Sequence, residues 1–341
     1  MSDLTLALDA MGGDFGPQVT VPASLQALER FHFLSISIFG DANTIKQFIP
    51  AQFPHLNRLH IEHCSQIVTM NDRPLTAVRN RRESSMRKAI DMVQQGRAAA
   101  CVSAGNTGVL MAMAKLVLKT LPGIDRPALI STLPTLQNKP VYMLDLGANV
   151  SCDSDTLLQF AVMGSVVAQK VNDIHKPRIS LLNVGEEAIK GNDVVKQTAE
   201  LLKETCQLNY VGYIEGHQIF EGNTDVIVCD GFVGNISLKT TEGVANLLFE
   251  HLKQAAKSSP LMRFLSFIST PFLKNVLCKV KPDQYNGASL LGLRGIVIKS
   301  HGNADQQAFL NAIKQAITEV EQQVPDRIQD SLESILLEKI C

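Results

Sequence analysis

The sequence predicts an α/β fold built on a doubly wound, largely parallel sheet. Two observations carry this prediction. Short, almost wholly apolar runs alternate along the chain with segments whose apolar residues have helical spacing, and glycine-rich polar turns follow most of the apolar runs. Strands that helices bury on both faces read as continuous apolar runs, and such strands are typical of parallel sheets.

The predicted elements follow from these two patterns. We expect strands at 4–8, 34–39, 58–62, 98–102, 128–132, 141–145, 179–184, 209–214 and 226–229. We expect helices at 18–30, 41–48, 83–95, 107–119, 155–171, 193–205, 233–256, 303–322 and 327–339. Pro17 leads into the first helix, as proline often does. A turn at 324–326 is expected to separate the last two helices.

The length of 341 residues suits one large α/β domain. We expect a single catalytic domain over residues 1–326, followed by a C-terminal helix over 327–341. One stretch near 258–281 breaks the alternating pattern, because it is rich in Leu, Phe and Ile, contains two prolines and is followed by lysines. We interpret this stretch as an apolar and basic insertion into the domain.

Composition narrows the functional class. The net charge is −1, so nothing indicates a nucleic-acid partner. No run of about 20 apolar residues is present to span a bilayer. The seven cysteines are widely spaced without a CxxC pair, and the N-terminus lacks the basic start of a secretory signal, so we expect reduced thiols, no metal site and a cytoplasmic location.

Six polar loops follow strand-like runs, and they are the best candidates for a site. They are residues 9–17, 103–108, 145–149, 183–192, 230–235 and 300–303. Ligands of open parallel sheets bind beyond the carboxyl ends of the strands, where these loops are expected to converge. Glycine lets a backbone approach an anion closely, and helix N-termini offer free N–H groups to it. One such loop is ordinary turn chemistry, but six indicate an anion site.

The residues that we expect to bind phosphate or another part of the substrate occupy these loops. They are Asp9, Gly12, Gly13, Ser103, Gly105, Asn106, Thr107, Gly108, Asp145, Asn149, Asn183, Glu187, Asp230, Gly234 and His301. The sequence SAGNTG at 103–108 runs from a strand into a helix, and it is the best phosphate cradle of the set.

Several candidate residues also have a purely structural interpretation. Lys190 follows two glutamates, so it is either a phosphate-binding cation or a member of a local charge pair. Asn235 is either a donor to a carbonyl oxygen or an N-cap. Asp9, Asp145 and Asp230 order the site, act as bases or cap the next helix. Cys101 and Cys229 fit small buried residues better than nucleophiles.

Several common catalytic signatures are absent. The SAGNTG loop lacks the Lys-Ser/Thr ending of a nucleotide-binding P-loop, and no GxGxxG follows the first strand. No GxSxG motif is present, which argues against a serine hydrolase.

Six motifs in their order resemble those of the bacterial acyl-ACP:phosphate acyltransferases of glycerolipid synthesis. They are LDAMGGDFGP, SAGNTG, MLDLGANV, LLNVGEEAIKGND, VIVCDGFVGN and LLGLRGIVIKSHG, and the resemblance extends from Leu8 to about Ala316. It implies a fold related to phosphate acetyltransferase and to the isocitrate and isopropylmalate dehydrogenases. It also places Lys190 and Asn235, which match its EEXIKGN and DGFVGN motifs, in the active site.

The resemblance further implies an activity and partners. The expected reaction converts acyl-ACP and inorganic phosphate into acyl phosphate and free acyl carrier protein, without a cofactor. The acyl phosphate then serves a membrane glycerol-3-phosphate acyltransferase, and the enzyme is a homodimer. The apolar residues between 261 and 277 have two interpretations, burial against the dimer partner or peripheral contact with an anionic membrane. The basic residues at 79–88 are a candidate docking patch for the acidic carrier.

Three alternatives remain open at this level. The first is a short-chain phosphate acyltransferase that acts on acyl-CoA. The second is a metal- and NAD-dependent dehydrogenase, with Asp145, Glu221 and Asp230 as possible metal ligands. The third is a non-catalytic scaffold that binds lipid or acyl carrier protein.

Overall fold

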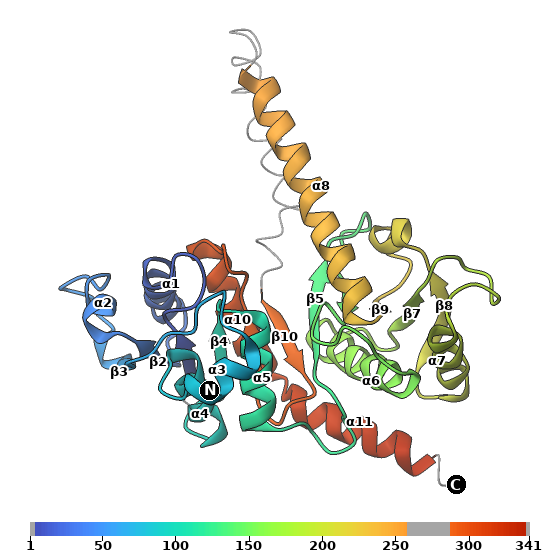
Figure 1. Ribbon diagram of the computed structural model, residues 1–341, viewed down its shortest axis with the longest axis horizontal. Coiled ribbons are helices and arrows are strands. Elements are labelled where there is room, and N and C mark those ends of the chain that lie inside the picture. Colours follow the sequence, from blue (N-terminus) through green and yellow to red (C-terminus); the bar gives the residue numbers. More distant parts are fainter. Residues whose placement is uncertain (1–3, 258–286, 339–341) are drawn as a thin grey trace.

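The computed structural model describes residues 4–257 and 287–338. They form two halves joined through one sheet (Figure 1). In the described residues the sheet is 11-stranded, with the order β3-β2-β1-β4-β11-β10-β5-β6-β9-β7-β8. The predicted α/β class with a mostly parallel sheet is therefore confirmed. The apolar segment 261–277, which we expect to contact a membrane or a partner subunit, lies outside the described residues.

The first half contains the N-terminal elements and two elements from near the C-terminus. Its strands are β1(Leu4–Asp9), β2(Leu34–Gly40), β3(Leu59–His63), β4(Ala100–Ser103) and β11(Ile296–Lys299). Its helices are α1(Pro17–Arg30), α2(Ala42–Lys46), α3(Pro74–Asn80), α4(Ser85–Gln94), α5(Thr107–Leu118) and α10(Gln306–Glu321). The five strands run parallel to one another, so their carboxyl ends lie along one edge.

The second half is built from the middle of the chain. Its strands are β6(Val141–Leu144), β7(Arg178–Leu182), β8(Asn209–Ile214) and β9(Val226–Val228), which are also mutually parallel. Its helices are α6(Ser154–Val171), α7(Asp193–Glu204) and α8(Gly231–Lys257). Between the halves lie β5(Ala128–Leu133) and β10(Ala288–Leu291), which pair antiparallel with each other. Finally, α11(Val324–Glu338) packs against α6.

The antiparallel pairing of β5 and β10 contradicts the expectation that all six polar loops converge at one edge of the sheet. β10 pairs antiparallel with β11, and β5 pairs antiparallel with β6. The sheet is therefore two parallel groups around an antiparallel centre, so the six polar loops do not all end strands at one edge. Instead they form one group of loops in each half.

All nine predicted strands are present, but some elements differ from the expectation. Strands β10 and β11 and helix α3 were not predicted. The predicted turn at 324–326 is wrong, because α11 already begins at Val324. The helices are separated instead at Gln323, whose φ of 50° lies in the left-handed region. Pro325 is tolerated because it lies in the first turn of α11, where its missing N–H has no helical partner.

Apolar layers on both faces of the sheet hold the two halves together. In the first half, α1 and α10 cover one face, where Leu28, Ile36 and Phe309 are fully buried. The opposite face is covered by α4 and α5, with Met86 and Leu110 in the core. In the second half α6 supplies Phe160 and several other buried apolar side chains of the core. These layers fix the strand ends from which the site loops emerge.

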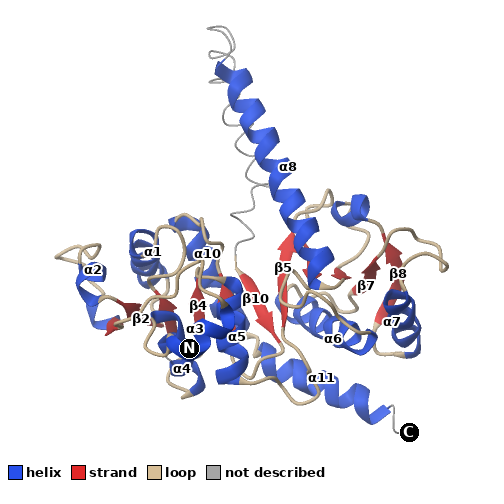
Figure 2. Ribbon diagram, viewed as in Figure 1, coloured by secondary structure: helices blue, strands red, loops and turns tan. Residues whose placement is uncertain are grey.

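Helix α8 is the exception to this packing. It starts in the second half and rises clear of both halves (Figures 1 and 2), and its 27 residues measure roughly 40 Å at about 1.5 Å each. Several large apolar side chains on it are about half exposed, namely Val244, Leu247, Leu248 and Leu252. Across the described ranges 4–257 and 287–338, no helix has the length and apolar character needed to cross a membrane.

Candidate active site

Asp9 organises the loops of the first half. It ends β1, is 1% exposed, and accepts a 2.6 Å hydrogen bond from the hydroxyl of Ser103 at the end of β4. The N–H of Gly105 donates to the Ser103 hydroxyl, at 3.1 Å. Burial raises the pKa of the Asp9 carboxyl, and the hydrogen bond from Ser103 opposes this rise. Asp9 thus fastens the first predicted loop to the SAGNTG loop.

Glycines allow these loops to pack backbone against backbone. A Cβ at Gly12 would stand 2.6 Å from the nitrogen of Gly105, and one at Gly13 would stand 2.8 Å from the carbonyl oxygen of Gly302. The N–H of Asp14 donates to that same oxygen at 2.8 Å. Three of the predicted loops, 9–17, 103–108 and 300–303, are therefore brought together as expected.

The structure gives Asn106 a specific local role. Its side-chain oxygen accepts from the N–H of Val109 at 3.1 Å, so Asn106 is the N-cap of α5. Its amide also donates to the carbonyl of Met70 at 2.7 Å. Thr107 and Gly108 form the first turn of α5, and a Cβ at Gly108 would lie 3.1 Å from Pro74 of α3. The segment 70–74 therefore lies beside the predicted phosphate cradle.

Asp145 organises the loops of the second half. It is fully buried, and its carboxylate accepts from the backbone N–H groups of Leu129, Ala148 and Asn149 at 2.9, 3.0 and 2.6 Å. The Asn149 side chain adds a bond of 2.9 Å and also donates to the carbonyl of Pro127. Burial raises the pKa of the Asp145 carboxyl, and these hydrogen bonds oppose it. Asp145 therefore shapes the loop 145–149 and does not cap a helix.

The first turn of α8 lies directly on this loop. Asp230 caps the helix, accepting from the N–H of Val233 at 2.8 Å. The alternative that Asn235 is an N-cap is therefore wrong, since the helix begins four residues earlier at Gly231. A Cβ at Gly147 would lie 3.3 Å from the Asn235 amide, which places this exposed side chain over the loop. Among the described residues nothing hydrogen-bonds to the Asn235 side chain.

The loop after β7 presents Lys190. Asn183 shapes it, donating to the carbonyl of Gly185 at 3.0 Å, and the N–H of Lys190 donates to the carbonyl of Glu187 at 2.9 Å. Lys190 is exposed, and within 4–257 and 287–338 its ammonium has no hydrogen-bond or ion-pair partner. A local charge pair does not account for Lys190. Because β7 and β6 both pair with β9, the loops that carry Lys190, Asp145 and Asn235 follow neighbouring strands.

Helix α8 connects the two groups of loops. The ammonium of Lys239 lies 3.1 Å from Nε2 of His301, and the carboxylate of Glu242 lies 2.7 Å from the ammonium and 3.7 Å from Nε2. His301 follows β11, so the first and second halves meet at this contact. Lys239 was not selected from the sequence, although it lies only four residues after the DGFVGN motif.

Lys299 was also not predicted as a site residue, although a lysine at the end of an apolar strand could have pointed to it. It ends an otherwise apolar strand and is 7% exposed, which is rare for lysine. Its ammonium donates to the carbonyl of Ala104 at 3.3 Å and to that of Ser300. Burial, followed by the nearby charge of Lys239, lowers the pKa of Lys299 to about 8.

Two further interpretations concern Cys101 and Cys229 as nucleophiles and the carboxylates as metal ligands. Cys101 and Cys229 are buried, and burial raises the pKa of both thiols, which suits core residues better than nucleophiles. In the part of the chain that the structure describes, no three His, Cys, Asp or Glu side chains are grouped to hold a metal ion.

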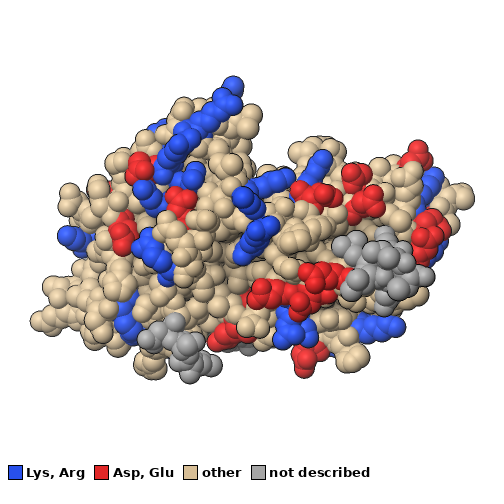
Figure 3. Space-filling view, turned by 90° about the horizontal axis from the view of Figure 1, so that it is seen from below, with Lys and Arg blue, Asp and Glu red and all other residues tan. Residues whose placement is uncertain are grey.

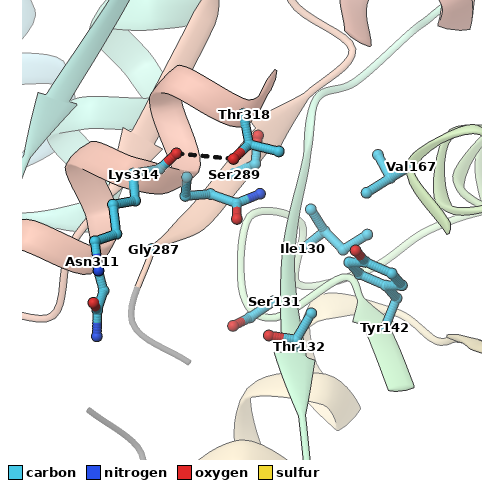
Figure 4. Close-up of a pocket in the computed structure, with 11 residues that line it drawn as sticks. Ile130, Ser131, Thr132, Tyr142, Val167, Gly287, Ser289, Asn311, Lys314 and Thr318 are labelled. Atoms are coloured by element: carbon cyan, nitrogen blue, oxygen red, sulfur yellow. Dashed lines mark hydrogen bonds between the residues drawn. The ribbon is translucent and has the colours of Figure 1, made fainter. Parts of the chain in front are cut away.

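A cavity of about 210 Å³ lies at the junction of the halves (Figure 4). Its lining residues are Ile130, Ser131, Thr132, Tyr142, Val167, Gly287, Ser289, Asn311, Lys314, Gln315 and Thr318. No predicted site residue is among them, so this cavity is not the predicted anion site.

Comparison with known proteins places the chain in a family. A model of the family described as "Fatty acid synthesis protein" matches residues 4–327. The chain is 59% identical, over 99% of both chains, to a phosphate acyltransferase of Shewanella sp. strain W3-18-1. Among solved structures, a phosphotransacetylase from Streptococcus pyogenes has a TM-score of 0.61 at 16% identity, covering 94% of each chain. An isocitrate dehydrogenase from Methylococcus capsulatus has a TM-score of 0.50 at 8% identity, covering 96% of this chain and 88% of its own.

The two structural neighbours show the fold alone, and this agrees with the predicted relation to phosphate acetyltransferase and isocitrate dehydrogenase. The full-length match to the family model and the 59% identity carry the assignment further. The chain belongs to the phosphate acyltransferase family.

Proposed function

We propose that this enzyme transfers a fatty acyl group from acyl carrier protein to inorganic phosphate. A phosphate oxygen attacks the thioester carbonyl carbon, and the carbon–sulfur bond breaks. The proton of hydrogen phosphate ends on the thiol, so the products are acyl phosphate and free carrier. The family assignment and the phosphotransacetylase-like fold support acyl transfer to phosphate.

One observation in the site carries the proposal. Within residues 4–257 and 287–338, the Lys190 ammonium and the Asn235 side-chain amide have no hydrogen-bond partner. Lys190 lies in the loop after β7 and Asn235 near the start of α8, and both follow neighbouring strands. Groups of this kind stabilise negative charge on phosphate and on the oxygen of a tetrahedral intermediate. The leaving thiolate needs little acid assistance, because the pKa of a thiol is roughly 8.5.

We assign the roles accordingly. Lys190 and backbone amides of the SAGNTG loop hold phosphate near the thioester, which converts a bimolecular step into one between held partners. Asn235 donates to the carbonyl oxygen as its charge develops. Asp9 and Asp145, whose carboxylates are already occupied by hydrogen bonds, fix the two groups of loops.

The test of the function is phosphate-dependent release of the carrier thiol. We expect palmitoyl-ACP to release free thiol only when phosphate is present, and acyl phosphate to form in equal amount. Acetyl-CoA is the matched donor for the rival short-chain activity, and faster turnover of acetyl-CoA would favour that rival. Release of thiol without phosphate would contradict the proposal. Turnover that requires NAD would indicate the dehydrogenase, and no thiol release from either donor would indicate a scaffold.

The product suggests the place of the enzyme in lipid synthesis. Acyl phosphate is an activated acyl donor, and we propose that a membrane glycerol-3-phosphate acyltransferase consumes it in glycerophospholipid synthesis. Adding such an enzyme and glycerol 3-phosphate to the assay should convert acyl phosphate to acylated glycerol phosphate.

Charge on the first half supports a docking place for the acidic carrier. Figure 3 shows Lys and Arg mixed with Asp and Glu over the lower face, with basic residues more prominent toward one end and acidic residues toward the other. Within the basic residues at 79–88, Arg81, Arg87 and Lys88 already pair with acidic neighbours. Arg79 and Arg82 are therefore the better candidates for carrier binding. Reversing both charges should raise the KM for acyl-ACP, most at low salt, and leave the KM for phosphate unchanged.

The exposed apolar stripe of α8 supports the expected homodimer. Val244, Leu247, Leu248 and Leu252 have the spacing of one helix face, and a second copy of the chain would remove them from water. Sedimentation should show a dimer that Leu247→Asp dissociates, whereas Asn246→Asp, also on α8, leaves it intact.

Peripheral membrane contact through 261–277 is a separate proposal. Liposome flotation should be lost in Phe264→Asp with Phe267→Asp.

A further inference from the structure

Lys239 places a positive charge where the two halves of the molecule meet. It comes from α8, whose first turns lie in the second half, and its ammonium lies 3.1 Å from the imidazole of His301 in the first half. Both side chains remain about half exposed, at 53% and 45%, so a solute can reach them. Glu242, 2.7 Å from the Lys239 ammonium, is the nearest counter-charge.

A second ammonium is buried in the first half at the same junction. Lys299 donates to the carbonyls of Ala104 and Ser300, so it underlies both the SAGNTG loop and the loop of His301. The charge of Lys239 lies close enough to add to the burial that lowers the pKa of Lys299, while Asp9 and Asp14 act against it. The junction thus gathers two ammonium groups and an imidazole beside the glycine-rich loops 9–17, 103–108 and 300–303.

The chemistry of this arrangement favours an anion with more than one charge. Glu242 offsets only one cation, and it comes from the same helix as Lys239. A doubly charged tetrahedral anion would take donors from α8 and from the loop after β11 at once. We infer that Lys239 and His301 bind a phosphate group at the junction and that Lys299 is the positioning residue behind them. The identity of the anion as phosphate rests on the proposed function.

This assignment makes the phosphate a link between the halves. Lys239 belongs to α8 and His301 follows β11, so an anion held by both side chains would contact the two halves at once. Lys239 and His301 could bind either inorganic phosphate or a phosphate group on the thiol carrier of the acyl donor. The kinetic experiment below distinguishes these two sources of the phosphate group.

The experiment uses inorganic phosphate as the probe and the full-length chain without an acyl donor. We measure the phosphate concentration at which the rise in Tm is half complete. Lys239→Met should raise that concentration about tenfold or more, the loss expected for one charge-assisted contact. Lys253→Met is the matched control, because Lys253 pairs with Glu250 on the same helix at the same spacing of three residues and should bind phosphate normally.

A second variant separates binding from mere structural support. Glu242→Gln removes the competing carboxylate, so it should lower the half-saturating phosphate concentration severalfold. A structural contact would instead be weakened by either variant, with phosphate binding reduced alike. Equal weakening in Lys239→Met and Glu242→Gln would therefore overturn the inference.

Steady-state kinetics assign the source of the phosphate group. A raised KM for phosphate in Lys239→Met assigns the pair to inorganic phosphate, and a rise confined to the KM of acyl-ACP assigns it to the carrier. Unchanged values in the thermal and both kinetic measurements would overturn the inference while leaving the proposed reaction intact. Conversely, phosphate binding that depends on Lys239 in a chain without thiol release would sink the reaction and keep the site.

Discussion

Gly234 lies so close to the backbone of Asp145 that a Cβ at position 234 would stand 1.9 Å from the Asp145 carbonyl oxygen. This contact sets the first turn of α8 directly on the loop that Asp145 organises. It also fixes the position of Asn235, the next residue, whose side chain lies over Gly147. Gly234, the second glycine of the DGFVGN motif, is therefore required by packing and not by a special φ angle.

Replacing Gly234 by alanine should displace α8 from the loop 145–149. The clash is with a backbone atom, which cannot rotate away, so we expect a loss of about 2 kcal/mol or more in the free energy of unfolding. Urea unfolding measures this loss. Gly243→Ala is the control on the same helix, because nothing lies within 4 Å of a Cβ there. That variant should be more stable by roughly 0.5–1 kcal/mol, and equal behaviour of the two variants would contradict the contact.

Replacing Asp145 by asparagine should destabilise the second half. The carboxylate accepts four hydrogen bonds, and an asparagine amide would turn a donor toward other donors in a fully buried place. We expect a cost of roughly 2–4 kcal/mol in urea unfolding. Asp153→Asn is the matched control, because Asp153 caps α6 and asparagine caps equally well. A change below about 0.5 kcal/mol in Asp145→Asn would show that its hydrogen bonds are not needed.

Much of this arrangement could be anticipated from the chain. Lys190 and Asn235 follow apolar runs that predicted strands correctly, and the loop motifs placed both residues near strand ends. Neither the pairing of β7 and β6 with β9 nor the resulting proximity of these loops is visible in the sequence, because strand order depends on long-range contacts. The distinction between Asp230, which caps a helix, and Asp145, which does not, also depends on which backbone N–H groups arrive from elsewhere.

Strands β10 and β11 were not predicted from the sequence for a different physical reason. Strands β10 and β11 have only four residues each, and Gly292, Arg294 and Gly295 interrupt the apolar pattern between them. Short strands with glycine between them read as a loop. The contact of Lys239 with His301 was equally invisible, because it joins residues 62 positions apart across the two halves.

Replacing Lys190 by alanine should reduce turnover while the chain stays folded. The ammonium is exposed and unpaired in the described structure, so its removal has little effect on stability. We expect kcat to fall on the order of 10²-fold or more, as for the loss of one donor to an oxyanion. Thiol release from palmitoyl-ACP measures the rate. Lys203→Ala, on α7 and paired with Glu200, should turn over normally, and near-normal turnover of Lys190→Ala would remove this residue from the mechanism.

Glu319 should make stability depend on pH between about 4.5 and 7. It lies in α10, 1% exposed, and accepts from the hydroxyl of Ser289 at 2.8 Å and the amide of Gln315 at 2.9 Å. Burial raises its pKa from 4.5 to about 7, so over this window the folded chain holds a proton that the unfolded chain has released. Stability therefore falls as pH rises through the window, by up to about 3 kcal/mol from this group.

Glu319→Gln tests this dependence, because glutamine keeps the shape and cannot ionise. Its amide oxygen can accept from Gln315 while its NH₂ donates to the Ser289 hydroxyl, which accepts as readily as it donates. We expect urea unfolding at pH 5 to differ little between the variant and the natural chain, and the variant to be the more stable at pH 8. Glu333→Gln on the exposed face of α11 should leave the pH dependence unchanged. If Glu319→Gln and the natural chain lost stability in parallel from pH 5 to 8, the buried carboxyl would not be the group that titrates.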